Sequence, residues 1–106
     1  MNFRYMRILV MFDLPVLTSE DKKEYRKFKK YLEKNGYLML QESVYCKLAL
    51  NNSVALAYEN SLENNKPKKG LVFLLKLTEN QFGNMKYIVG DKQSEIVDSE
   101  ERFLEL

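Results

Sequence analysis

Residues 8–15 read Ile-Leu-Val-Met-Phe-Asp-Leu-Pro, and this stretch decides the fold. Five apolar residues in a row predict a strand that is buried on both faces. Leu14-Pro15 ends the strand, because proline cannot donate a hydrogen bond to a neighbouring strand and restricts the residue before it. Asp13 therefore marks the point where a central strand leaves the sheet and a charged group can meet a ligand. An aspartate that caps the following turn is the alternative.

The residues after this strand predict a helix with recognisable ends. Thr18 precedes Asp21 by three positions, which is the spacing of a capping box, although Ser19 is a competing cap. Asn35-Gly36 predicts the end of the helix, because glycine adopts the left-handed backbone that often follows a last helical turn. Between these ends, apolar residues recur at helical spacing and define a core face: Tyr25, Phe28, Tyr31 and Leu32.

The rest of the chain predicts further strands and a second helix. Asn51-Asn52-Ser53 offers caps for that helix, and the polar loop from Asn64 to Gly70 follows it. The predicted strands cover residues 6–13, 37–40, 44–48 and 71–77, a short helical turn covers 78–85, and a short extended piece covers 87–89. This order is β-α-β-β-α-β and predicts an α+β, ferredoxin-like sandwich. We expect one domain over residues 1–90 and an acidic C-terminal extension over residues 91–106.

Two of the predicted strands are apolar on both sides. The first strand places Ile8, Val10 and Phe12 on one face and Leu9 and Met11 on the other, and residues 71–77 alternate in the same way. Two helices cover only one face of a four-stranded sheet, so the second face would expose a large apolar patch. We therefore expect a symmetric homodimer that covers this face.

The apolar end of the chain offers two further arrangements. Phe103-Leu104 and Leu106 are expected to add a strand at the dimer interface, on the partner's sheet edge, or to fold back over their own sheet. The sequence leaves both arrangements open.

The amino-acid composition limits the catalytic mechanisms and metal sites that this chain can provide. The 106 residues contain no histidine and a single cysteine, Cys46. Ser-His and Cys-His catalysis and zinc sites with histidine ligands are therefore excluded, and hydrolysis would need carboxylates, lysine, tyrosine or a hard metal with oxygen ligands. A lone cysteine in a strand is typical of a small core residue and of a reduced, cytoplasmic protein. No apolar run reaches the length of a membrane span, so no membrane partner is expected.

Charge is divided unevenly along the chain. Residues 1–90 carry 15 Lys and Arg against 9 Asp and Glu, whereas residues 91–106 carry 2 against 6. A basic body indicates an anionic partner, and a lysine-rich solvated surface is the alternative. The candidate nucleic-acid-binding residues lie on the outer side of the first helix and in the loop before the last strand: Lys22, Arg26, Lys29, Lys30, Lys34, Lys68 and Lys69.

A two-fold interface would change the role that is expected of Asp13. This residue has the same strand parity as Leu9 and Met11, so two Asp13 carboxylates approach each other if that face meets the symmetry axis. The two charges would repel unless a divalent cation lies between them. Mg²⁺ typically uses one or two protein carboxylates together with water and phosphate oxygens. The sequence thus predicts one Mg²⁺ site per dimer, of the kind that phosphodiesterases use.

Several stretches together resemble the small CRISPR-associated adaptation protein of the Cas-two family, most closely in its type II-A form. They run in the same order along nearly the whole chain: Val10–Pro15, Tyr25–Phe28, Gly36, Met39–Tyr45, Thr78–Phe82 and Ile88–Gly90. The resemblance implies a ferredoxin-like homodimer that lies between two dimers of the Cas-one integrase, in a heterohexamer, and helps to hold incoming double-stranded DNA. Many members are described as metal-dependent endonucleases of single-stranded RNA or double-stranded DNA. Asp13 would then be the Mg²⁺ ligand and catalytic residue.

Three functional hypotheses follow. The first is a non-catalytic adaptor in CRISPR spacer acquisition, a dimer that bridges integrase subunits and supports duplex DNA on its basic helix. The second is a Mg²⁺-dependent endonuclease that uses paired Asp13. The third is a toxin-type, metal-dependent endoribonuclease of the same fold that acts without an integrase. We favour the first as the biological role. The second stays open as a catalytic capacity, although one carboxylate per chain is sparse for catalysis.

Overall fold

A computed structural model describes residues 5–90 of the 106-residue chain. The predicted C-terminal strand, and the whole extension over residues 91–106, lie outside the described residues. The elements follow one another as β1 (Met6–Asp13), α1 (Ser19–Lys34), β2 (Leu38–Gln41), β3 (Val44–Ala49), α2 (Asn52–Asn64), β4 (Leu71–Thr78) and α3 (Glu79–Gly83). The β-α-β-β-α-β order is confirmed, and α3 extends it.

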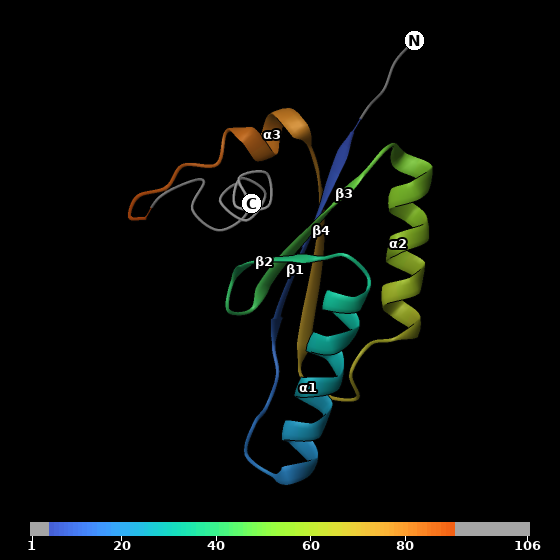
Figure 1. The fold of residues 1–106 in the computed structure, drawn as a ribbon, viewed down its shortest axis with the longest axis vertical. Coiled ribbons are helices and arrows are strands. Elements are labelled where there is room, and N and C mark those ends of the chain that lie inside the picture. Colours follow the sequence, from blue (N-terminus) through green and yellow to red (C-terminus); the bar gives the residue numbers. More distant parts are fainter. Residues whose placement is uncertain (1–4, 91–106) are drawn as a thin grey trace, which may run out of the picture.

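The four strands form one antiparallel sheet in the order β2-β3-β1-β4. This arrangement is the ferredoxin-like fold, with the apolar strand β1 between two neighbours as its composition predicts. Figure 1 shows α1 and α2 on the same side of the sheet, with α3 at the end of the sheet away from the start of α1. Within the described residues, no helix is long and apolar enough to cross a membrane.

Helix α1 begins and ends where the sequence predicts. Thr18, and not the competing Ser19, is the N-cap: its Oγ1 accepts the Asp21 N–H at 3.0 Å, and Asp21 Oδ2 accepts the Thr18 N–H at 3.2 Å. Asn35 is the C-cap, and Gly36 follows it with a φ of +86°. The two reciprocal bonds satisfy N–H groups that the first turn of a helix leaves without partners.

We expect Thr18→Ala to lower the free energy of unfolding by about 1 kcal/mol, because alanine cannot accept the Asp21 N–H. Urea unfolding measures this change. Thr18→Ser retains the hydroxyl and should retain most of the stability. An alanine variant as stable as the wild type would show that the cap contributes nothing.

The core lies between the sheet and the two long helices. Ile8 and Val10 are completely buried, and the Phe12 ring packs edge-to-face on Phe28 at 5.2 Å and against Tyr45 at 5.8 Å between centroids. From the helices, α1 contributes Phe28 and Leu32 and α2 contributes Ala55 and Leu62. One face of β1 therefore holds both helices, as its apolar alternation predicts.

The opposite face of the sheet, which we call the open face, is apolar, and its β4 side chains are exposed within the described residues, whereas Leu9 on β1 is buried. Strand register places Leu9 beside Leu75 and Met11 beside Phe73 on this face. Leu71, Phe73 and Leu75 are 53%, 55% and 47% exposed, whereas Val72 and Leu74 turn toward the core. The predicted two-sided character of β1 and β4 is confirmed. Such a patch on a small domain marks an interaction surface.

Helix α3 covers one end of the open face. The Arg7 guanidinium reaches it from β1, where its Nε donates to Glu79 Oε2 at 3.0 Å and its Cζ lies 4.6 Å from the centre of the Phe82 ring. Residues 84–90 follow α3 without forming a helix or strand, so the extended piece expected at 87–89 does not join the sheet. Ile88 and Val89 are 80% and 89% exposed in the described part of the chain.

Candidate functional site: Asp13 and the basic helix

Asp13 is the last residue of β1 and lies at the edge of the open face. It is exposed, and its partner in the sheet register is Leu71, the first residue of β4. It has the same parity on β1 as Leu9 and Met11, so all three belong to the open face. Within residues 5–90 its carboxylate makes no hydrogen bond or ion pair. An exposed carboxylate without such a bond is available to a ligand and does not cap the following turn.

Residues 5–90 of one chain do not provide a complete ligand set for a divalent cation. Among the described residues, no group of three or more His, Cys, Asp or Glu side chains could hold a metal. At the end of β1, the described part of the chain thus provides the carboxylate of Asp13. Mg²⁺ accepts one or two protein carboxylates and fills its remaining positions with water and phosphate oxygens. The residues fit Mg²⁺ if a second copy brings its own Asp13 to the same place.

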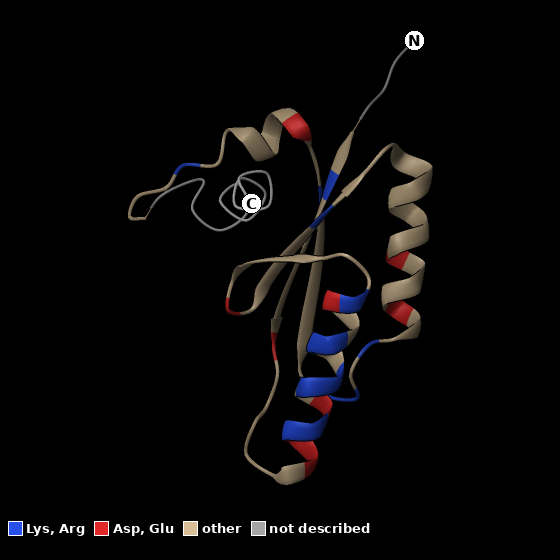
Figure 2. Ribbon diagram, in the orientation of Figure 1, with Lys and Arg blue, Asp and Glu red and all other residues tan. Residues whose placement is uncertain are grey.

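Helix α1 gathers most of the positive charge. Figure 2 shows blue bands along most of α1 and in the loop beside it, whereas α2 carries no blue. A shallow depression of about 610 Å³ lies on α1 and is lined by Lys23, Arg26, Lys27, Lys29, Lys30 and Glu33. Five cations from two helical turns on one surface can follow the phosphates of a nucleic-acid backbone.

This depression includes only part of the predicted set. Arg26, Lys29 and Lys30 line it, whereas Lys22 and Lys34 lie elsewhere on the exposed surface of α1. Lys23 and Lys27 line it as well, although they are not among the nucleic-acid-binding residues predicted from the sequence. The signal was present in their spacing, because residues 23, 27 and 30 follow one another at helical intervals of four and three.

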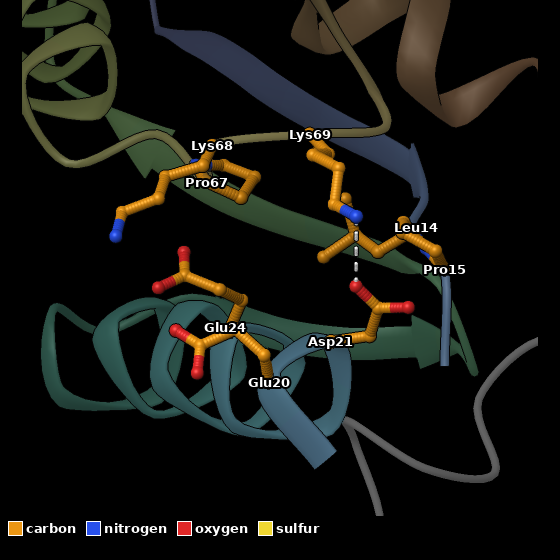
Figure 3. Close-up of a pocket in the computed structure, with 8 residues that line it drawn as sticks. All are labelled: Leu14, Pro15, Glu20, Asp21, Glu24, Pro67, Lys68 and Lys69. Carbon is orange, nitrogen blue, oxygen red and sulfur yellow. Dashed lines mark ion pairs between the residues drawn. The ribbon is translucent and has the colours of Figure 1, made fainter. Parts of the chain in front are cut away.

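The loop before β4 carries Lys68 and Lys69, and the two lysines have different surroundings. Both line a small cavity of about 50 Å³ between this loop and the start of α1, with Leu14, Pro15 and Pro67 as its apolar wall. Figure 3 shows the Lys69 ammonium directed at Asp21, and its Nζ lies 3.2 Å from Asp21 Oδ1. Lys69 therefore neutralises a carboxylate that is only 4% exposed, whereas Lys68 forms no such pair in the described structure.

Asp21 makes the stability of the chain depend on pH. The hydrogen bond from the Thr18 N–H and the nearby Lys69 ammonium lower the pKa of Asp21 below its ordinary value of 3.8. A carboxyl with a lowered pKa stabilises the fold above its unfolded pKa, and this contribution is lost as the pH falls through the folded pKa.

We expect Asp21→Asn to weaken the dependence of stability on pH below about 4, the range in which an ordinary aspartate takes up its proton. The measurement is urea unfolding of wild type and variant between neutral pH and pH 3. Identical acid dependence in the two proteins would contradict the role of this carboxylate.

The other chemically reactive side chains are held inside the fold. Burial raises the pKa of the Cys46 thiol, which is completely buried, as expected for a core cysteine. Burial also raises the pKa of Tyr37 and of Tyr45 to about 12. The Lys47 ammonium lies 3.8 Å from the centre of the Tyr58 ring, and burial lowers its pKa. None of these groups offers an exposed nucleophile or base beside Asp13.

Comparison with known proteins agrees with the resemblance seen in the sequence. The family model of the CRISPR associated protein Cas2 matches residues 6–85. A protein of Treponema denticola is 45% identical over 101 residues, which cover 95% of this chain and 100% of the relative. A protein of Streptococcus mutans serotype c is 46% identical over 99 residues, covering 93% of this chain and 91% of the relative.

A third relative, from Ligilactobacillus salivarius, is 45% identical over 97 residues, covering 92% of this chain and 96% of the relative. All three relatives are named CRISPR-associated endoribonuclease Cas2. The matched region spans every strand and helix described above. The chain therefore belongs to the CRISPR associated protein Cas2 family.

Proposed function

We propose that this chain is a homodimeric scaffold in CRISPR spacer acquisition, which bridges dimers of the Cas-one integrase and holds duplex DNA. The observation that carries the proposal is the open face, an apolar sheet surface with Asp13 at its edge. A second copy packed on this face would bury Leu71, Phe73 and Leu75, which a single chain leaves about half exposed. The same packing would bring two Asp13 carboxylates together.

Duplex DNA fits the basic surface of α1 better than a single strand does. Proteins that bind single strands usually stack bases on exposed aromatic rings. The aromatic residues of α1 are not available for stacking, because Tyr25, Phe28 and Tyr31 pack against the core. What α1 exposes is an array of cations, which supports binding to a phosphate backbone without base recognition. Two-fold symmetry would double this array.

The second candidate activity is Mg²⁺-dependent cleavage of a phosphodiester by the Asp13 pair. The names of the relatives, which describe endoribonucleases, favour it. Bound Mg²⁺ would polarise a phosphate and lower the pKa of a coordinated water. Asp13 would hold and orient the ion. A toxin-type endoribonuclease would need the same carboxylate without any integrase partner.

Asp13→Ala separates the scaffold from the nuclease. We expect duplex DNA affinity to stay within about twofold of wild type, because Asp13 contributes no phosphate contact, and spacer acquisition to continue. Any Mg²⁺-dependent cleavage should disappear. Glu42→Ala, which removes another exposed carboxylate, is the matched control and should retain every activity.

Two outcomes would reject the scaffold as the main role. The first is loss of spacer acquisition by an Asp13→Ala protein that still folds and dimerises. The second is cleavage of single-stranded RNA by the purified wild type together with a complete failure to bind the integrase subunit, which would favour the toxin-type enzyme.

A further inference from the structure

The residues that precede β4 lie directly against the backbone of Asp13. Gly70 has a φ of +95°, and a Cβ added to it would lie 2.8 Å from the Asp13 carbonyl oxygen and 2.7 Å from Leu14 Cδ2. Real Cβ atoms do not approach other atoms so closely, so only glycine allows this contact. The start of β4 thus contacts the end of β1 at Asp13, the residue that is proposed to bind the metal ion.

Lys69 fixes this contact to the helix. Its ammonium binds Asp21 in the first turn of α1, and Asp21 in turn belongs to the capping box with Thr18. Figure 3 shows Lys69 and Asp21 facing each other across the small cavity, with Leu14 and Pro15 alongside. The Asp21 side chain is 4% exposed and that of Lys69 is 67% exposed, so the Asp21 carboxylate has little access to solvent or to other cations. A connection runs from α1 through Lys69 and Gly70 to the backbone of Asp13.

Asp13 needs such support, because its own side chain makes no hydrogen bond or ion pair within the described residues. Its place is set by the backbone alone, at the last residue pair of the β1–β4 ladder, where Asp13 meets Leu71. Strand ends separate readily unless something holds them. The contact through Gly70 acts at that point.

We propose that Lys69 and Gly70 are positioning residues, which hold the end of β1 so that the Asp13 carboxylate keeps its orientation at the edge of the open face. This inference rests on the proposed role of Asp13 as a metal ligand. It also assigns Lys69 to Asp21 rather than to a DNA phosphate. Residues that orient a metal ligand typically change metal affinity by about ten- to a hundredfold when they are removed.

The test compares Lys69→Ala, Lys69→Arg and the neighbouring control Lys68→Ala. Mn²⁺, used alone as a probe, is titrated by electron paramagnetic resonance into the full chain. We expect Lys69→Ala to weaken Asp13-dependent Mn²⁺ binding about tenfold, Lys69→Arg to restore it, and Lys68→Ala to leave it unchanged. Equal Mn²⁺ affinity in wild type and Lys69→Ala would overturn the inference and leave the proposed function standing.

Amide hydrogen exchange tests the positioning role of Lys69 and Gly70 without using a metal ion. In Lys69→Ala the amides of Asp13 and Leu71 should exchange about tenfold faster, while those of Ile8 and Leu9 stay unchanged. Gly70→Ala should show the same local pattern. Unchanged exchange at residues 13 and 71, or equal acceleration along all of β1, would overturn the positioning role. Absence of Asp13-dependent Mn²⁺ binding in the wild type would instead reject the proposed metal site.

Discussion

Charge reversal at Arg26 and Lys30 is expected to weaken the proposed binding of duplex DNA about a hundredfold, because the proposed dimer would present four repulsive charges in place of four attractive ones. Both side chains line the depression on α1 and lie one helical turn apart. The dependence of affinity on salt should flatten as well, since each lost phosphate contact lowers the slope of log K against log salt by about 0.9. Fluorescence anisotropy with a labelled duplex at several salt concentrations measures both effects.

Lys86→Glu is the control for this experiment. It changes the net charge in the same direction from an exposed position outside α1. We expect it to reduce the affinity only slightly and to retain the wild-type salt slope. An Arg26→Glu/Lys30→Glu protein with an unchanged slope would show that the basic surface of α1 does not contact phosphates.

Phe73→Asp is expected to convert the proposed dimer into monomers. Phe73 lies in the middle of β4 on the open face and is 55% exposed in a single chain. Loss of its burial and the cost of desolvating a carboxylate together amount to at least about 2 kcal/mol per chain. Both chains change at once, so the dissociation constant of the dimer should rise about a thousandfold. Sedimentation velocity over a range of protein concentrations measures the change.

Leu56→Asp is the matched control for the dimer experiment. Leu56 is 50% exposed, but it belongs to α2 on the helical side of the sheet, so its replacement should leave the dimer intact. A Phe73→Asp protein that remains a dimer at low concentration would place the interface elsewhere. A dimer lost in both variants would indicate general unfolding.

The sequence alone was sufficient to predict those helices and strands whose ends depend on residues close together in the chain. The apolar run before Asp13 predicted the central strand, and the Thr18–Asp21 spacing predicted the helix start, because each depends on neighbouring residues only. The alternation in residues 71–77 predicted the uncovered face, since strand parity alone decides which side chains share a surface.

Contacts between distant segments were not predictable in the same way. Lys69 was expected to meet a phosphate, and nothing near it in sequence indicates that the fold brings it to Asp21. The contact of Gly70 with the Asp13 carbonyl likewise depends on how the two strands meet. Arg7 binds α3 for a similar reason. Pairing of Asp13 across a dimer remains a prediction, because it depends on a second chain.

Cross-linking at position 13 tests the central claim, which is that two Asp13 side chains meet across the open face of a homodimer. Cys46 is the single cysteine, so Asp13→Cys in a Cys46→Ala background places one thiol in each chain. A short bifunctional thiol reagent should join two chains rapidly, whereas Leu56→Cys in the same background should not be joined. Complete labelling at position 13 without cross-linking, in a protein that sediments as a dimer, would contradict the account.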